Sequence, residues 1–271
     1  MITFPNCKIN LGLNILRKRE DNFHDLKTIF FPIPFTDVLE VIHTSGAFHF
    51  QTSGLSIANN ENNLCLKAYE LLKNDFPTLP AITMHLHKAI PMGAGLGGGS
   101  ADAAFTLKLL IDKFNLSVTE EMLSNYALQL GSDCPFFLIN RPCFAEGRGE
   151  KLTPINIDLK GYKLLLVNPG IHINTASAFS KINPHLPSKH IKDIIAQPID
   201  TWKNKLVNDF EGPVFSEYPQ VKEIKENLYK QEAVYASMSG SGSTVYGLFK
   251  DDVANNLKDK FRDYFQKLIQ L

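Results

Sequence analysis

Residues 91–104 read Pro-Met-Gly-Ala-Gly-Leu-Gly-Gly-Gly-Ser-Ala-Asp-Ala-Ala, and five of the first nine are glycine. Before this stretch, the apolar residues Ile82, Met84 and Leu86 alternate with polar ones, which is the period-two pattern of a half-buried strand. After it, residues 101–114 contain no Gly or Pro and carry an apolar stripe at three- and four-residue spacing, which predicts an amphipathic helix. The glycines are therefore predicted to lie where a strand leads into a helix.

A glycine-rich entry to a helix is suited to binding a phosphate group. The first-turn amides of a helix have no acceptor within the helix, and they lie at the positive end of its dipole. Glycine removes the Cβ atoms that would keep a bulky anion away, and it permits positive φ angles. A flexible loop or helix cap is the alternative interpretation, but glycine at this density is entropically costly without a closely bound ligand. We therefore expect a cradle for nucleotide phosphates.

Two common phosphate-binding motifs fit this stretch poorly. Gly93, Gly95 and Gly98 satisfy the dinucleotide-binding spacing, with Asp112 as a candidate ribose ligand. The residues after the predicted helix read as a second helix, however, where a Rossmann unit needs a strand, so a dinucleotide oxidoreductase is a distant alternative. The ATPase P-loop requires a Lys before its Ser, and Gly99 occupies that position. What remains is a phosphate loop without a lysine.

Composition sets limits on the partners of the protein. With 271 residues the chain can form a large core in one or two domains. Its 28 Lys and Arg residues balance 28 Asp and Glu residues, so no overall field favours nucleic acid or an anionic membrane, and neither is expected as a partner. The four cysteines lack CxxC spacing, which predicts free thiols in a reducing compartment. Because a leader sequence and a long apolar run are both missing, we expect a cytoplasmic protein.

The glycine-rich stretch resembles the signature loop of the galactokinase, homoserine kinase, mevalonate kinase and phosphomevalonate kinase superfamily, the GHMP kinases, which bind ATP phosphates without a Walker lysine. Two other segments match the superfamily in the expected order, and together they resemble its 4-diphosphocytidyl-2-C-methyl-D-erythritol kinase family. The resemblance implies an α+β, two-domain GHMP kinase fold. We expect an N-terminal domain like domain 2 of ribosomal protein S5 over residues 1–155. A ferredoxin-like C-terminal domain is expected over residues 156–271.

The resemblance also implies an activity. The chain is expected to be an ATP- and Mg²⁺-dependent kinase that phosphorylates the 2-hydroxyl of a small cytidylated polyol in non-mevalonate isoprenoid precursor biosynthesis, acting as a monomer or weak homodimer. The expected ATP-binding residues are Pro91, Met92, Gly93, Ala94, Gly95, Leu96, Gly97, Gly98, Gly99, Ser100 and Ala101. No residue is assigned as a metal ligand. Another GHMP kinase, of the homoserine or mevalonate type, and a non-catalytic ATP-binding module on the same fold are the alternatives.

The first of the two other segments begins in a predicted strand, residues 7–16, on which Lys8 and Asn10 point away from the alternating apolar residues. A lysine near the start of a strand is usually a solvated edge charge. Residues 8–11 and 19–26 resemble the first motif of the kinase family, in which the lysine and asparagine face the reacting hydroxyl. The resemblance therefore implies a catalytic Lys8 and a substrate-binding Asn10.

The loop after this strand contains an aromatic–histidine pair, which in the family receives the cytosine. Carried over, the pair is Phe23 and His24. A π-face can stack on a pyrimidine, and a histidine can form hydrogen bonds at its edge. Asn22 stands where the family usually has Gly, and Asn tolerates the left-handed conformation better than most residues. Phe179 is by resemblance a second aromatic wall, with a helix core residue as the equal alternative.

The second segment, residues 131–137, contains Asp133 directly before an apolar run, so it is either a helix N-cap or a catalytic carboxylate. It resembles the family's Gly-Ala-Asp-Val-Pro-Phe-Phe element, whose aspartate lies beside the acceptor hydroxyl, and this favours catalysis; the two roles are compatible. Asn63, a candidate helix cap, and Lys88 are further candidate nucleotide contacts.

Three local predictions complete the picture. Residues 37–43 and 47–52 read as two strands of a hairpin turning at residues 44–46. Ser117 and Glu120 form a predicted capping box for a helix that ends before Gly131. A final helix is predicted from an apolar face made of Val253, Leu257, Phe261, Tyr264, Phe265 and Leu268.

Overall fold

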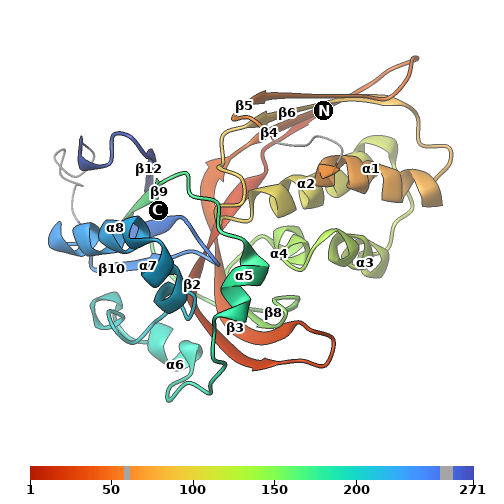
Figure 1. Cartoon of the computed structure of the whole chain (residues 1–271). Coiled ribbons are helices and arrows are strands. Elements are labelled where there is room, and N and C mark those ends of the chain that lie inside the picture. Colours follow the sequence, from red (N-terminus) through yellow and green to blue (C-terminus); the bar gives the residue numbers. More distant parts are fainter. Residues whose placement is uncertain (58–61, 251–258) are drawn as a thin grey trace. The chain divides into compact units, whose positions relative to one another are not determined.

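The computed structural model describes residues 1–57, 62–250 and 259–271, and it contains both helices and strands (Figure 1). The chain divides into two compact units, and each unit is made of several separate segments of the sequence. Unit 1 comprises Met1–Cys7, Phe35–Met92 and Gly97–Arg141. Unit 2 comprises Lys8–Pro34, Gly93–Leu96 and Pro142–Leu271. The domain boundary at residue 155 stays a prediction.

Unit 1 contains a four-stranded sheet in the order β1-β4-β6-β5. Its strands are β1 (Ile2–Thr3), β4 (Val38–His43), β5 (His49–Gly54) and β6 (Ile82–Lys88). Both predicted strands of the hairpin are present, but the hairpin itself is wrong, because β6 lies between them. β4 is antiparallel to β6 and β5 is parallel to it. A helix connects β5 to β6, and such a crossover is what a parallel pair requires.

Helices pack on this sheet and build the core of unit 1 (Figure 1). They are α1 (Leu64–Asp75), α2 (Gly98–Phe114), α3 (Glu120–Leu130) and α4 (Cys134–Ile139). α2 contacts each of the other three. Buried side chains of α1 and α2, such as Leu72 and Leu107, pack in one cluster with Leu39 and Met84 of the sheet. The strand and the helix predicted on either side of the glycine-rich stretch are therefore confirmed.

One helix cap of unit 1 is the residue predicted from the sequence, and another is a different residue. Asn63 caps α1, and its side chain accepts a hydrogen bond from the Cys65 amide. The capping box predicted from Ser117 is wrong, because the cap of α3 is Thr119, whose side chain accepts from the Met122 amide. Leu116 and Val118 lie against the core, and their packing delays the start of the helix until Glu120.

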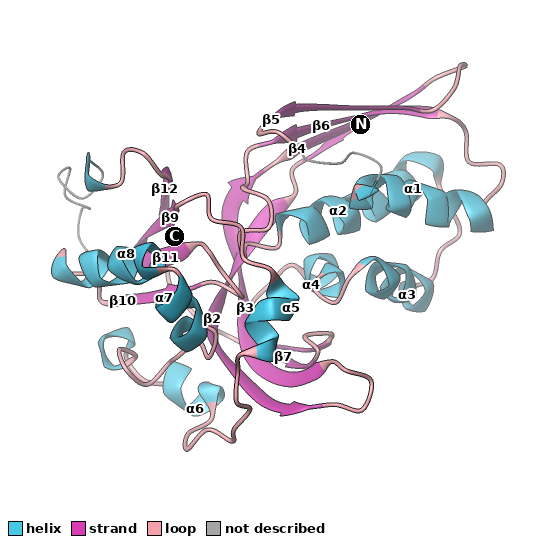
Figure 2. Cartoon of the chain, viewed as in Figure 1, coloured by secondary structure: helices cyan, strands magenta, loops and turns pink. Residues whose placement is uncertain are grey.

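Unit 2 holds two further sheets (Figure 2). The first has the strand order β2-β3-β7-β8, with β2 (Asn6–Lys18), β3 (His24–Thr36), β7 (Cys143–Gly147) and β8 (Lys151–Pro154). The start of β2 and the end of β3 belong to unit 1. The second, in the order β10-β11-β9-β12, has β9 (Lys163–Asn168), β10 (Tyr235–Met238), β11 (Val245–Phe249) and β12 (Phe265–Gln270).

The predicted final helix is wrong from residue 261 onward, where the structure has a turn followed by a strand. Residues Phe265–Gln270 form β12, which pairs antiparallel with β9 from Phe265↔Asn168 onward. The helical spacing of the apolar residues is overridden because pairing with β9 supplies hydrogen-bond partners for the backbone of this segment. Val253 and Leu257 lie outside the described residues.

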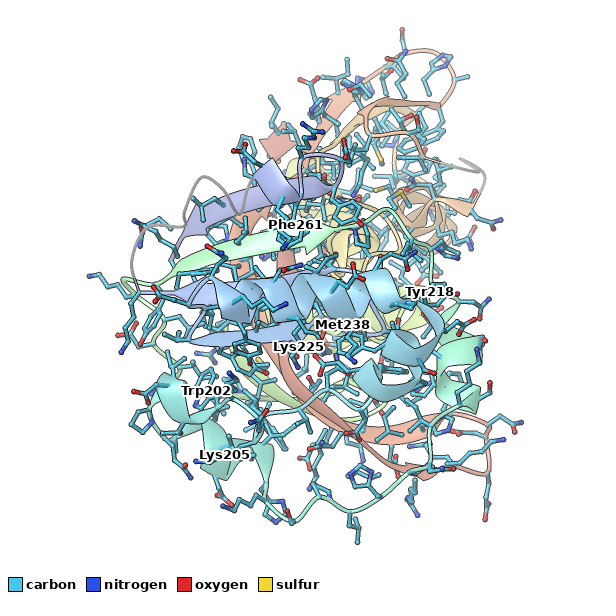
Figure 3. The ribbon with its side chains drawn as sticks, turned by 60° about the vertical axis from the view of Figure 1, so that its left-hand side comes forward. Trp202, Lys205, Tyr218, Lys225, Met238 and Phe261 are labelled. Atoms are coloured by element: carbon cyan, nitrogen blue, oxygen red, sulfur yellow. The ribbon has the colours of Figure 1, made fainter. Side chains whose placement is uncertain are left out.

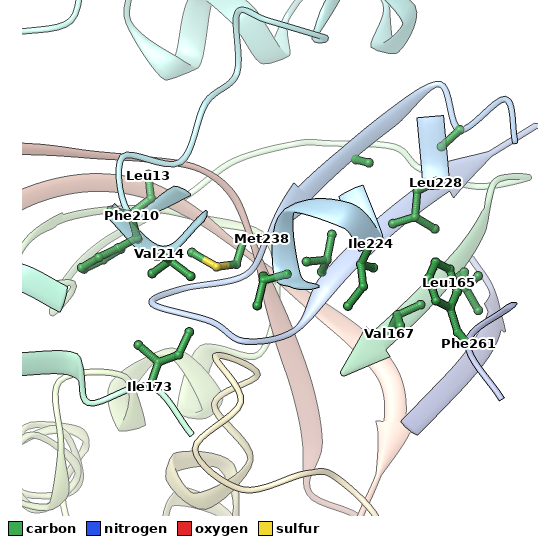
Figure 4. Packing of buried hydrophobic residues seen from close by; sticks show 14 of the residues in the cluster. Leu13, Leu165, Val167, Ile173, Phe210, Val214, Ile224, Leu228, Met238 and Phe261 are labelled. Atoms are coloured by element: carbon green, nitrogen blue, oxygen red, sulfur yellow. The ribbon is translucent and has the colours of Figure 1, made fainter. Parts of the chain in front are cut away.

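Unit 2 also contains the helices α5 (Thr175–Ser180), α6 (Ile191–Ile195), α7 (Glu211–Glu217) and α8 (Pro219–Lys230). α8 lies along β10 and β11, and Figure 3 shows Lys225 on this helix close to Met238. The apolar face of α8 is Val221, Ile224 and Leu228. Figure 4 shows this face packed with Val167 and Phe261 in the core of the unit.

All four cysteines are buried free thiols, as predicted. In the part of the chain that the structure describes, no helix has the length and apolar character required to cross a bilayer.

Candidate functional site

The glycine-rich stretch follows β6 and leads into α2. Several of its glycines cannot be replaced by a larger residue without backbone strain or a clash. Gly93, Gly95 and Gly97 have φ angles of 60°, 78° and 69°, in the left-handed region. In unit 2, a Cβ on Gly95 would lie 1.9 Å from the carbonyl oxygen of Ser239. Gly95 is therefore required both by its backbone angles and by the close approach of another main chain.

The start of α2, in unit 1, presents main-chain amides without a competing cap. Gly97 is the N-cap residue, and no described side chain forms a cap hydrogen bond there. The first helical hydrogen bond runs from the Ala101 amide to the Gly97 carbonyl at 2.9 Å. Within α2, which is fully described, the amides of Gly98, Gly99 and Ser100 therefore have no acceptor. This arrangement can bind an anion.

Gly99 is the most informative of these residues. It is the second residue of α2, and no described atom outside its own helix and chain neighbours lies within 4 Å of the position that its Cβ would take. Its φ angle is not in the left-handed region. Alanine would therefore fit here and would favour the helix. Neither packing nor backbone conformation accounts for glycine at this position.

The remaining residues of the predicted cradle differ in what they expose. Ala94, Leu96 and Ala101 are buried, so only their main chains could contact a ligand. Met92 is about half exposed. In unit 2 the main chain at Ala94 and Leu96 is held by the amides of Thr244 and Lys8, which donate to the two carbonyl oxygens.

Lys8 is not a solvated edge charge, because it is buried on β2. Its Nζ donates to the Asn10 Oδ1 at 2.6 Å and to the Gly95 carbonyl oxygen at 3.1 Å. The same carbonyl accepts from the Ser239 Oγ at 2.8 Å. Asn10 is buried as well, and its Nδ2 donates to the Thr28 Oγ1 at 2.9 Å. Within unit 2, the predicted catalytic lysine and the glycine-rich stretch thus share a hydrogen-bond network.

The three predicted aromatic and histidine residues all belong to unit 2, and two of them are in contact. The rings of His24 and Phe179 are stacked, with centroids 4.7 Å apart and planes 11° from parallel. Phe23 is half exposed, and the Arg148 guanidinium lies over its ring at 4.7 Å from the centroid. Asn22 adopts a φ of 64°, which confirms that Asn takes the left-handed position in this loop.

Asp133, in unit 1, precedes α4. It occupies the N-cap position, yet within the described chain its side chain makes no cap hydrogen bond to the helix. Its backbone is in the right-handed helical region, whereas a capping residue is usually extended. Of the two alternatives, the N-cap is therefore present in position but, among the described residues, without a hydrogen bond from the side chain to the helix. The catalytic role stays a prediction, and Lys8 and Asp133 belong to different units.

Lys88, a candidate nucleotide contact, is buried in unit 1 with two carboxylates. Its Nζ pairs with Asp37 and, at 2.7 Å, with Asp102 Oδ2. Burial by itself lowers the pKa of the Lys88 ammonium, but the charges of Asp102 and Asp37 outweigh burial and raise it. Burial raises the pKa of the Asp102 carboxyl, and the Lys88 charge opposes that rise. The Lys88 side chain does not present its charge to solvent.

Comparison with known proteins places this site in a family. The family model described as GHMP kinases N terminal domain matches residues 63–141, and the one described as GHMP kinases C terminal matches residues 191–267. A 4-diphosphocytidyl-2-C-methyl-D-erythritol kinase from Bacteroides fragilis is 53% identical over 256 residues, which cover 93% of each chain. This chain belongs to that kinase family.

Other relatives agree with the assignment. A kinase of the same family from Cytophaga hutchinsonii is 49% identical over 92% of each chain. The crystal structure of a 4-(cytidine 5′-diphospho)-2C-methyl-D-erythritol kinase, 30% identical, matches with a TM-score of 0.85 over 99% of this chain and 98% of that one. The mevalonate kinase of Methanococcus jannaschii, 13% identical, matches with a TM-score of 0.72 over 100% and 98%, and shows the shared fold alone. The expected two-domain GHMP kinase fold is confirmed.

Sequence reasoning missed several residues around the family's motifs. Ser239 lies in a glycine-rich turn that resembles a third GHMP motif, but the turn alone does not say which serine reaches the Gly95 carbonyl. Arg148 carries no signal in the sequence that connects it with Phe23. Asp37 and Asp102 are separated from Lys88 by 51 and 14 positions, and only the fold brings them together. No cluster of three His, Cys, Asp or Glu residues that could hold a metal ion occurs among the described residues.

The His24–Phe179 stack gives a testable prediction. Burial lowers the pKa of the His24 imidazole below its ordinary value of 6.5, and the charge of Lys18 lowers it further. Proton NMR of the His24 ring should therefore give a titration midpoint below 6.5. Phe179→Ala uncovers the ring and should move the midpoint up toward that value, whereas Phe179→Leu keeps an apolar cover and should move it less. A wild-type midpoint at or above 6.5 would contradict this account.

Proposed function

We propose that the chain transfers the γ-phosphoryl group of ATP to the 2-hydroxyl of 4-diphosphocytidyl-2-C-methyl-D-erythritol. Membership in the kinase family supports this substrate. Gly99 is the single observation on the chain itself that carries the ATP part of the proposal, because no described atom occupies the space beside its missing Cβ, and a ligand can approach there. A triphosphate bound at the amides of α2 is such a ligand.

Phosphoryl transfer depends mainly on alignment and charge neutralisation, because the transition state is loose and its charge lies on the transferred oxygens. In the proposal, the amides of Gly98, Gly99 and Ser100 hold the phosphates. Lys8 supplies a positive charge, fixed in its orientation by Asn10 and by the Gly95 carbonyl. Mg²⁺, when bound to the nucleotide, neutralises further phosphate charge.

Asp133 is the proposed partner of the acceptor hydroxyl. A carboxylate is a weak base compared with an alkoxide, so it orients the hydroxyl and accepts its proton late in the reaction. This role rests on the family motif at residues 131–137.

The cytidine base is proposed to bind at the aromatic cluster of unit 2. Phe23 offers an exposed ring face, and His24 and Phe179 already form a stack of the kind that a pyrimidine can join. The histidine nitrogens can hydrogen-bond to the polar edge of the base. Cytoplasmic location and a monomeric or weakly dimeric state stay predictions.

The first prediction concerns Gly99→Ala. Replacing glycine in an open helical position should raise the free energy of unfolding by roughly 0.5–1 kcal/mol, measured by urea denaturation. The added methyl group should obstruct the phosphates and weaken ATP binding about tenfold, measured by calorimetry.

Gly212→Ala is the matched control. Gly212 is likewise the second residue of a helix, α7, and no described atom outside its own helix and chain neighbours lies within 4 Å of the position that its Cβ would take. It should leave ATP affinity unchanged; because Pro213 follows Gly212, and a side chain before proline disfavours the helical backbone, no gain in stability is expected there. If Gly99→Ala binds ATP as tightly as the wild type, the phosphates do not lie at this turn.

A second prediction separates binding from chemistry. Lys8→Ala and Asp133→Asn should each lower kcat by about two to four orders of magnitude, because each removes a group that acts in the transition state. ATP binding, measured in the absence of acceptor, should change much less for Asp133→Asn. Turnover close to that of the wild type in either variant would remove that residue from the mechanism.

The experiment that tests the function is a panel of acceptors with an ADP-release assay. Only the cytidylated methylerythritol should support rapid turnover, and homoserine and mevalonate should not. In the same assay, Phe23→Ala should raise KM for the cytidylated acceptor by about tenfold, because a stacked aromatic contact contributes on the order of 1–3 kcal/mol, and it should leave KM for ATP unchanged. Preferred turnover of homoserine or mevalonate, or nucleotide binding without phosphorylation of any acceptor, would refute the proposal.

A further inference from the structure

Three charged side chains are buried together at the base of the glycine-rich stretch, all within unit 1. Lys88 ends β6, Asp37 directly precedes β4, and Asp102 is the fifth residue of α2. The side chains of Lys88 and Asp37 are 0% exposed, and that of Asp102 is 4% exposed. We call this group the Lys88 cluster. It contains two carboxylates and one ammonium.

The oxygens of Asp37 connect the cluster to the chain just before the glycines. Asp37 Oδ1 accepts the amides of Ala89 and Ile90 at 2.6 and 2.9 Å, while Oδ2 pairs with Lys88. Because Ala89 and Ile90 lead directly into residue 91, Asp37 and Lys88 fix the upstream end of the glycine-rich stretch.

Asp102 connects the same ammonium to the downstream end. Asp102 lies in the second turn of α2, directly after Ala101. The three residues before Ala101 are Gly98, Gly99 and Ser100, whose amides have no acceptor within the helix. A Cβ on Gly98 would lie 2.9 Å from Ile90 Cγ2 and 3.4 Å from the Lys88 Nζ. The first turn of α2 is therefore packed directly against the Lys88 cluster, and one ammonium ties together both ends of the glycine-rich stretch.

Stability alone does not explain this cluster. A buried ion pair often contributes no more to stability than apolar side chains of similar size would. Asp102 Oδ1 is a buried atom without a hydrogen-bond partner among the described residues, and such an atom is costly. Between the two tied ends, three glycines adopt left-handed angles, and glycine loses much conformational freedom when it is ordered. Because the Lys88 cluster fixes both ends of the loop, the loop loses less conformational entropy when a ligand binds.

We propose that Lys88, Asp37 and Asp102 are positioning residues for ATP: they hold the first turn of α2 at a fixed place relative to the end of β6, and so keep its amides ready for the phosphates. The inference rests on the proposed use of ATP. Lys88 acts here through α2, since its ammonium is held in the interior by two carboxylates. It is not assigned a direct contact with the nucleotide.

Two variants test the proposal. Asp102→Asn is nearly isosteric and removes one charge from the cluster. The triple variant Lys88→Met, Asp37→Asn and Asp102→Leu removes all the charges, and it keeps an amide oxygen at position 37 for the two backbone amides. Tyr126→Phe is the control, because it removes a side-chain hydrogen bond to Asp75 elsewhere in unit 1. Thermal denaturation identifies the temperatures at which each variant is fully folded.

Calorimetry with ATP, without acceptor, then gives the dissociation constants of the folded proteins. The triple variant should bind ATP about tenfold more weakly and Asp102→Asn about threefold more weakly, because the loop must be ordered on binding. At saturating ATP, kcat and KM for the cytidylated acceptor should stay within about twofold of wild type, which a general loss of structure would not give. Tyr126→Phe should leave ATP affinity unchanged.

Failure of the positioning role can be distinguished from failure of the proposed function. If the folded variants bind ATP like the wild type, or lose kcat at unchanged ATP affinity, the positioning role is overturned and the proposed function stands. Should the triple variant not fold, Asp102→Asn decides the question alone. If the wild type binds ATP but phosphorylates no acceptor, only the proposed function falls. If the wild type does not bind ATP, both fall.

Discussion

The contact between the main chains of Gly95 and Ser239 is the constraint on which the site in unit 2 depends. No side chain fits between them, since a Cβ on Gly95 would lie 1.9 Å from the Ser239 carbonyl oxygen. The Gly95 carbonyl in turn accepts from the Ser239 Oγ and the Lys8 Nζ. A lysine on the first long strand, a glycine before the long helix and a serine near the end of the chain are thereby held in one network. The buried ammonium of Lys8 is stabilised by hydrogen bonds to the Asn10 Oδ1 and to the Gly95 carbonyl oxygen.

In unit 1 the glycines have a different purpose. Gly98 packs against Ile90 and Lys88, whereas no described atom outside its own helix and chain neighbours lies within 4 Å of the Cβ position of Gly99. Adjacent glycines in one motif thus serve two needs. Gly98 allows the helix to approach a strand, and Gly99 is proposed to leave room for a ligand. A sequence pattern cannot distinguish the two, because both needs are met by the same missing atom.

Sequence reasoning succeeded where the signal is local. The alternation through Ile82, Met84 and Leu86 predicted β6, and the glycines that follow it predicted the turn into α2. It failed where a distant segment decides the structure. Phe265 and Leu268 have helical spacing, yet β9 takes them into a sheet. The two strands at residues 37–54 are correct, but β6 separates them. At the candidate site, motifs indicated Lys8, Phe23 and His24, whose roles stay predictions, while the contacts of Arg148 and Asp37 depend on the fold alone.

The stack of His24 on Phe179 has a thermodynamic consequence. Its imidazole already covers one face of the Phe179 ring, and the edge contact with Phe210 occupies another side. A planar ligand that is to lie on the covered face must first displace the imidazole. The free energy of binding then reflects the difference between two aromatic contacts rather than the strength of one. A weaker stack of His24 on Phe179 would therefore give tighter binding of the ligand.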